Sequence, residues 1–182
     1  MQWNKCLCAM VIPPVLMAWF ISSSSAHAVA LGRTSVGMTG VINDAACAID
    51  TNSRDQTINM GVLPVSQVIR DGRLPGKPFS IRLIECRLER VDPNKPDWQK
   101  FQITFTGKAH GELFDMDGEA RGIGMRILNS QGKVMMPGVA SVPADIVPGE
   151  IVLNYTLDIM SNGEAMRSGA YRSTVHFKMD YY

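Results

Sequence analysis

GAYRSTVHFKMDYY, residues 169–182, is the stretch of this chain that decides its fold. Taken in twos, it divides into a mainly apolar set and a mainly polar set. The apolar set is Tyr171, Ser173, Val175, Phe177, Met179 and Tyr181, and the polar set is Ala170, Arg172, Thr174, His176, Lys178, Asp180 and Tyr182. This period-2 alternation predicts a strand with one face on a core and the other in water. We expect it to be an edge strand, and a regular apolar edge is an aggregation hazard unless another strand pairs with it.

The same stretch resembles the C-terminal signature of chaperone–usher pilus subunits. That signature combines a glycine fourteen residues from the end (Gly169), alternating apolar residues and a penultimate tyrosine (Tyr181). Subunits of that family lack a final strand, which a periplasmic chaperone lends first and the N-terminal arm of a neighbouring subunit then replaces, a recognised example of strand addition. The resemblance implies that the acceptor groove and the edge strand contacted by the chaperone include Gly169, Tyr171, Val175, Phe177, Met179 and Tyr181. Alternation alone also fits a closing strand that pairs within its own chain.

The first 28 residues are expected to be a cleaved secretory signal. Lys5 supplies a positive charge, Cys6–Ile21 is apolar but interrupted by two prolines, and Ala26–Ala28 forms an A-x-A cleavage site. Cleavage there makes Val29 the mature N-terminus. A membrane anchor is the alternative, but the apolar run is short and broken by proline.

Charge and cysteine content narrow the function classes. The chain has 18 Lys and Arg against 17 Asp and Glu, and its charges are scattered, so no nucleic-acid partner is expected. Beyond the signal, Cys47 and Cys86 form an even pair in an oxidising compartment and predict a disulfide. Closing that loop stabilises the fold by about 4 kcal/mol in the chain-entropy model. Two thiols without clustered histidines do not complete a tetrahedral metal site, so we expect no metal or cofactor.

Residues 29–42 are predicted to be an extended N-terminal arm, and residues 43–182 the folded domain. The arm leads into Ala45-Ala46-Cys47, and this passage resembles the pilin stretch that runs from a glycine-tipped donor arm to the first cysteine. The resemblance implies a donor strand in which the relevant positions are Gly32, Thr34, Val36, Met38 and Gly40. A disordered terminus is the alternative for such a segment.

The rest of the chain predicts short strands separated by Pro- and Gly-rich loops, with no helix longer than a turn or two. The predicted strands are Thr57–Gly61, Phe79–Cys86, Phe101–Thr106, Gly118–Leu128, Ile151–Met160 and Gly169–Tyr182. The predicted connections are 63–77, 91–98 and 137–149, with a tight turn at 161–163. This pattern predicts an all-β protein with one disulfide, an incomplete immunoglobulin-like β-sandwich of the pilin type that lacks its final strand.

No catalytic constellation can be assembled from the sequence. Only His110 and His176 lie beyond the signal, and no serine or cysteine has a plausible base and orienting group. Asp115, Asp117 and Glu119 hint at calcium but lack the rest of a ligand loop. We therefore expect a non-enzyme.

The resemblance implies a structural subunit of a surface pilus that supports adhesion, most similar to minor subunits. Its implied partners are a periplasmic pilus chaperone, an outer-membrane usher and neighbouring pilin subunits, and its implied route is secretion through the periplasm to the fimbrium. Two alternatives stay open. One is a terminating or anchoring subunit whose groove accepts no further strand, and the other is a monomeric exported β-sandwich that binds a ligand.

Overall fold

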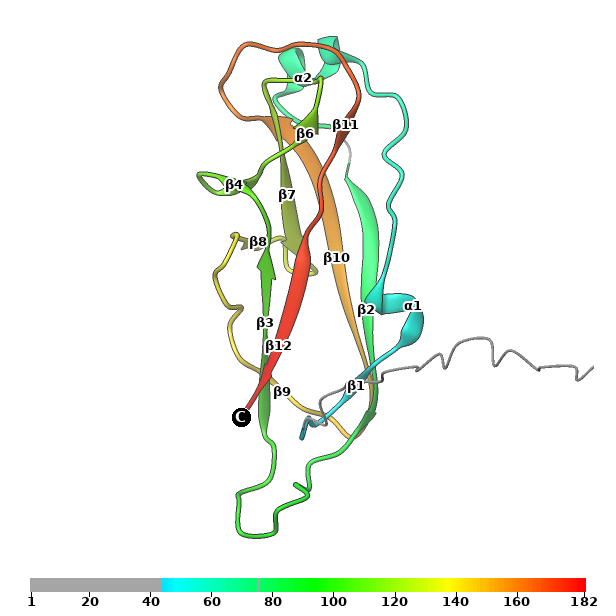
Figure 1. The fold of residues 1–182 in the computed structure, drawn as a ribbon, viewed down its shortest axis with the longest axis vertical. Helices are drawn as coiled ribbons and strands as arrows, with labels where there is room; N and C mark the ends of the chain where they lie inside the picture. The colour runs from blue at the N-terminus through cyan, green and yellow to red at the C-terminus, as the bar shows by residue number, and fades with distance from the viewer. Residues whose placement is uncertain (1–43, 75) are drawn as a thin grey trace, which may run out of the picture. The chain divides into compact units, whose positions relative to one another are not determined.

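The structure, a computed structural model, describes residues 44–74 and 76–182. The expected signal (1–28) and the expected arm (29–42), together with residue 43, therefore lie outside the described residues. Most of the described residues that belong to regular elements are in antiparallel strands, which form two main sheets and one small ribbon (Figure 1).

The larger sheet has seven strands within the described part of the chain. In spatial order they are β1 (Ala48–Ile49), β2 (Lys77–Cys86), β10 (Gly149–Ser161), β7 (Ile123–Asn129), β5 (Leu113–Phe114) and β4 (Ala109–His110), with β8 (Val134–Met135) also paired to β7. The smaller sheet consists of β12 (His176–Tyr181), β3 (Lys100–Thr106) and β9 (Ala144–Asp145). A separate ribbon pairs β11 (Tyr171–Arg172) with β6 (Asp117–Gly118).

Alternating side chains of both sheets build one core. Strand β2 contributes Ile81 and Leu83, β10 contributes Tyr155, Leu157 and Ile159, and β3 contributes Phe101, Ile103 and Phe105. The alternation read from the sequence in these three strands is therefore confirmed. Cys47 and Cys86 form the expected disulfide, which ties the residue before β1 to the end of β2.

Two short helices complete the fold. The first, α1 (Thr51–Arg54), begins where the Asp50 carboxylate accepts a hydrogen bond from the Asn52 N–H at 3.0 Å. The second, α2 (Val65–Asp71), begins after Pro64 and ends at Gly72, which has a φ of 69° and donates its N–H to the Val68 carbonyl. Left-handed φ at a helix end favours glycine. The predicted connection 63–77 thus contains a helix of about two turns.

Glycines permit a tight crossing near the start of the C-terminal stretch. A Cβ on Gly169 would lie 2.6 Å from the Glu119 Cβ and 2.8 Å from the Ala120 N. At this crossing the Ala170 carbonyl accepts hydrogen bonds from the N–H groups of residues 119 and 120, at 2.8 and 3.1 Å. On the facing segment Gly118 has a φ of 126°, which a residue with a side chain rarely adopts. Gly169 is thus required by backbone proximity.

Three predicted elements differ in the structure. Residues 57–61 form no strand, because their backbone pairs with none of the described residues. The stretch 169–182 is divided into β11 and β12, because the first pairs with β6 and the second with β3. Residues 118–128 are divided in the same way, with Gly122 at a φ of 80° between β6 and β7.

Candidate functional site

Strand β12 has a partner on one side only among the described residues. It pairs with β3 in a register that places Phe177 opposite Phe105 and Tyr181 opposite Phe101. The smaller sheet has the order β12-β3-β9, so β12 is its edge strand. The expectation of an edge strand is therefore met in the part of the chain that the structure describes.

Backbone hydrogen bonds identify which groups of β12 face the open side. Tyr182 and Lys100 exchange both N–H to carbonyl bonds, at 2.8 and 3.2 Å, and so form a hydrogen-bonded pair. Because such pairs alternate along an antiparallel ladder, residues 176, 178 and 180 also bond to β3. The N–H and C=O groups of Phe177 and Met179 then point away from β3. On β3, the residues opposite Phe177 and Met179 are Phe105 and Ile103. Their carbonyls agree with this assignment, because they accept hydrogen bonds from the N–H groups of residues 138 and 141 on the other side of β3.

The two edges of the smaller sheet are protected differently. The segment beside β3 on the β9 side contains Pro137 and Pro143, and Pro148 follows it. Proline has no N–H and is one of the usual devices that keep an edge from pairing. Residues 176–182 contain no proline and keep a regular register with β3. The β12 edge is therefore left competent to pair.

An apolar groove of about 1130 Å³ adjoins the first part of the C-terminal stretch. One wall is formed by residues 168–177 and the other by residues 53–63. The floor consists of core side chains from both sheets, namely Phe79, Ile81, Phe105, Met116, Met125, Ile127, Leu157 and Ile159. Of the residues named in advance, Gly169, Tyr171, Val175 and Phe177 line this groove. Met179 and Tyr181 lie farther along the same strand.

The inward side chains along residues 168–177 and β12 are less buried than those in the centre of the core. The inward residues alternate with exposed ones as expected, yet Tyr171, Val175, Phe177 and Met179 are only half-buried. All four pack against the buried core on one side. Nothing among the described residues closes over their other side to the extent seen in the centre of the sandwich.

The opposite wall was missed as a functional element from sequence. Residues 57–63 make no backbone–backbone hydrogen bond with the described residues. Ile58, Met60 and Leu63 nevertheless pack against the core, while Val62 is fully exposed. The signal was the run Thr57–Gly61, in which the apolar residues Ile58 and Met60 alternate with Asn59. It predicted a strand. In the structure the side chains of Ile58 and Met60 pack against the core, but the backbone of this run is unpaired among the described residues.

The C-terminal end of β12 is anchored. Tyr181 packs edge-on against Trp98, with ring centroids 6.0 Å apart, and its hydroxyl donates to the Cys47 carbonyl at 3.4 Å. Burial raises the pKa of the Tyr181 phenol. The Arg90 guanidinium lies 3.4 Å from the Trp98 ring centre. These contacts hold the penultimate tyrosine against the disulfide-bearing segment and fix the position of the strand.

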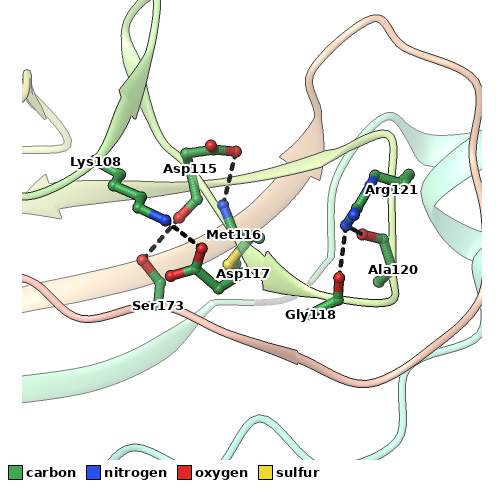
Figure 2. Close-up of polar contacts among 8 residues, drawn as sticks. All are labelled: Lys108, Asp115, Met116, Asp117, Gly118, Ala120, Arg121 and Ser173. Carbon is green, nitrogen blue, oxygen red and sulfur yellow. Dashed lines mark hydrogen bonds and ion pairs between the residues drawn. The ribbon is translucent and has the colours of Figure 1, made fainter.

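The other end of the groove is fixed by a polar network (Figure 2). Ser173 donates its hydroxyl to the Asp115 carbonyl at 2.8 Å, and the Asp115 carboxylate accepts from the Met116 N–H at 2.9 Å. Lys108 forms an ion pair with Asp117, and this hydrogen bond raises the pKa of Lys108 and lowers that of Asp117. The inward hydroxyl of Ser173 is thereby used within the fold. Two of the three carboxylates that hinted at calcium, those of Asp115 and Asp117, thus have protein partners.

The described residues offer no reactive centre. Residues 44–74 and 76–182 contain no group of three His, Cys, Asp or Glu side chains arranged to hold a metal ion. His110 and His176 are both exposed. No helix in this part of the chain is long and apolar enough to cross a bilayer. What the arrangement can do is bind an extended segment through backbone groups and apolar side chains.

Comparison with known proteins gives a consistent result. A protein-family model described as "Fimbrial protein" matches residues 36–182. The PRS fimbrial minor pilin protein of Escherichia coli is 29% identical over 145 residues, covering 78% of this chain and 74% of that protein. Fimbria A protein of Serratia marcescens is 27% identical over 186 residues, covering 100% and 99%. The solved structure of the P pilus rod subunit PapA is similar with a TM-score of 0.66 and 25% identity, covering 76% of this chain and 100% of that one.

Proposed function

The chain belongs to the fimbrial protein family, and we propose that it is a structural pilus subunit whose groove takes up a β-strand donated by a second chain. It is not an enzyme, and its partners belong to the chaperone–usher pathway: a periplasmic chaperone, an outer-membrane usher and neighbouring pilins. The subunit is exported and assembled into surface fimbriae. Residues 1–28 serve as the cleaved signal in this proposal.

The observation that carries the proposal is the unpaired edge of β12 beside an apolar groove. The backbone groups of Phe177 and Met179 point to the open side, and the side chains of Val175 and Phe177 are half-buried next to it. A strand laid along this edge satisfies those backbone groups and places alternate side chains in the groove. Residues 57–63 offer a second unpaired backbone on the opposite wall.

The energy available to a donated strand is large on the scale of a domain. Three or four buried apolar side chains contribute about 1.5–3 kcal/mol each. Each backbone hydrogen bond adds roughly 1 kcal/mol. The stability of a whole domain is about 5–15 kcal/mol, so folding and assembly are coupled in this proposal.

The proposed occupant is the N-terminal arm of a neighbouring subunit, equivalent to residues 29–42 of this chain. Those fourteen residues match in number the fourteen residues of 169–182 that present the edge and groove wall. The arm carries one charged side chain, Arg33, and its positions Gly32, Thr34, Val36, Met38 and Gly40 alternate along it. Before assembly, the chaperone supplies the strand in the same place.

A terminating subunit is the second candidate. The open volume between residues 53–63 and 168–177 supports a subunit that accepts a further strand, because a terminator needs a groove that excludes one. We therefore favour a subunit within the fibre.

Thermal unfolding tests the proposal. The chain is produced by export, so that its disulfide forms, and is heated alone and with peptides copying the N-terminal arms of pilins, including residues 29–42. A matched control peptide carries Asp in place of Val36 and Met38. At a peptide concentration of about 100 times Kd the expected stabilisation is about 2.7 kcal/mol, or roughly 5–10 °C in Tm for a domain of this size. Stabilisation by a chaperone alone indicates a terminator, and a stable chain indifferent to every partner contradicts the proposal.

A further inference from the structure

The groove is built from two chemically different halves. Around Phe177 the lining is aromatic, and the rings contact one another. Phe105 lies 6.4 Å from Phe177 and 5.1 Å from Tyr155, and Tyr155 stacks on Phe79 at 5.4 Å. Phe177, Phe105 and Phe79 line the groove, and Tyr155 contacts the last two without lining it. The four residues come from β12, β3, β2 and β10, so both sheets meet there. We call them the aromatic half.

Farther along the groove the lining includes Tyr171 and three methionines. Met60, Met116 and Met125 all line it and come from three separate parts of the chain. Met125 lies opposite Ile159 on β10, four residues from Tyr155, which corresponds to about 13 Å along the strand. Met116 precedes β6, which pairs with Tyr171, six residues before Phe177. We call these three residues the methionine half.

The two halves respond differently to the size of an incoming side chain. Ring–ring contacts leave the aromatic half few alternative arrangements, because an aromatic side chain has two rotatable bonds and its neighbours fix it. Methionine is unbranched, has three rotatable bonds and fills irregular spaces. Surfaces rich in methionine are used where one site must accept differing partners.

The backbone at Met60 adds to this adaptability. Residues 57–63 form no backbone–backbone hydrogen bond with the described residues, so no ladder fixes the position of that wall. By contrast, Phe177 and Phe105 face each other in a continuous antiparallel pair. Backbone freedom and side-chain freedom therefore coincide at the same end of the groove.

We propose that the aromatic half selects the donated strand by side-chain size and that the methionine half tolerates different sizes. Met60, Met116 and Met125 are then the residues that allow this subunit to accept arms of more than one sequence. The inference rests on the proposed function, since it concerns which strands the same groove accepts.

The test uses the exported chain and a set of peptides based on residues 29–42. At each of the positions Ala30, Gly32, Thr34, Val36 and Met38, the peptide carries in turn Ala, Val, Leu, Met or Phe, and Kd is measured. Coupling of each peptide position to Phe177→Leu or to Met60→Leu assigns it to one half of the groove. Positions coupled to Phe177 are expected to vary more than about tenfold in Kd across the set, and positions coupled to Met60 less than about threefold.

The second part of the test uses a variant with Met60→Leu, Met116→Leu and Met125→Leu. Leucine is close to methionine in volume but less flexible, so folding should be retained while the spread of Kd at the methionine half widens to about tenfold. Met135→Leu is the matched control, because Met135 is as buried as Met125, lies opposite Ile127 and does not line the groove. If the triple variant does not fold, the three single variants are measured.

The inference is overturned if Kd depends equally on side-chain size at every peptide position, or if Met135→Leu widens the spread of Kd as much as the triple variant does. In either case the groove remains a strand acceptor. Absence of binding by every peptide overturns the proposed function and this inference together. The two failures are therefore distinguishable.

Discussion

Replacing Phe177 by alanine should weaken strand uptake much more than it weakens the fold. Phe177 is half-buried before a strand arrives, and it packs on Phe105 from one side only. In a closed core, Phe→Ala costs about 3–5 kcal/mol. In the free chain, the half-buried ring of Phe177 contributes roughly half of that free energy. Its contacts with a donated strand contribute the remainder, about 2 kcal/mol.

That remainder is the loss expected in binding. About 2 kcal/mol corresponds to a roughly 30-fold rise in the Kd for an arm peptide or for the chaperone. Isothermal titration gives Kd, and urea unfolding of the free chain gives the loss in the fold itself. Lys178→Ala is the matched control, because Lys178 is the next residue, points outward and makes only an exposed ion pair with Asp180. We expect its Kd to stay within about twofold of the parent.

One result would show that the Phe177 ring does not contact the donated strand. If Phe177→Ala lowers the free energy of unfolding equally with and without peptide, the ring gains nothing from the donated strand. Kd would then be unchanged, and the open side of β12 would not be the binding edge.

Three further predictions concern the scaffold. Gly169→Val should lower the free energy of unfolding by about 2–4 kcal/mol in urea titrations, because its Cβ would clash with Glu119 and displace two backbone hydrogen bonds. Replacing Cys47 and Cys86 by serine should cost about 4 kcal/mol, since the disulfide closes a separation of 39 residues. Burial raises the pKa of Tyr155 to about 12, so the neutral phenol favours the fold. The contribution of Tyr155 to stability is therefore complete below pH 10 and should fall by about 1.4 kcal/mol per pH unit between pH 10 and 12. Tyr155→Phe should lessen the alkaline loss without abolishing it, because burial also raises the pKa of Tyr171 and of Tyr181.

Each of these has its own control or contrary result. Gly132→Ala introduces a side chain with nothing within 4 Å and should cost only about 1 kcal/mol, from its positive φ of 74°. An equal loss at Gly132 and Gly169 would remove proximity as the explanation. For the disulfide, reduction of the parent chain should reproduce the serine variant. For Tyr155, an unchanged pH profile in the phenylalanine variant would assign the alkaline loss to other groups.

Elements with a strong period of two were predictable because both faces of each strand are decided locally. Residues 79–86, 101–106 and 151–160 alternate in sequence, and their apolar residues face the core as expected, although Thr104 and Asp158 between them are buried as well. The cysteine pair was predictable from parity and compartment, and the structure joins it.

Elements decided by distant partners were not predictable. The interruption at residues 173–175 arises because β11 and β12 pair with different strands, and neither partner is signalled in the sequence of the stretch itself. Asp158 lies between the inward residues 157 and 159, yet it is buried in an ion pair with Arg126 at 2.9 Å across β10 and β7, a partner that the local pattern does not indicate. Residues 57–63 have the pattern of a strand without a backbone partner among the described residues. In this account that partner is the donated strand, which belongs to another chain.

Amide hydrogen exchange of β12, measured by NMR with and without an arm peptide, tests directly whether this edge is open and accepts a strand. We expect the N–H groups of Phe177 and Met179, which point away from β3, to exchange quickly in the free chain and to be protected more than about tenfold by the peptide. The N–H groups of Lys178 and Asp180 bond to β3 and should change much less. Protection of Phe177 and Met179 in the free monomer, or no change on peptide binding, would contradict an open, strand-accepting edge.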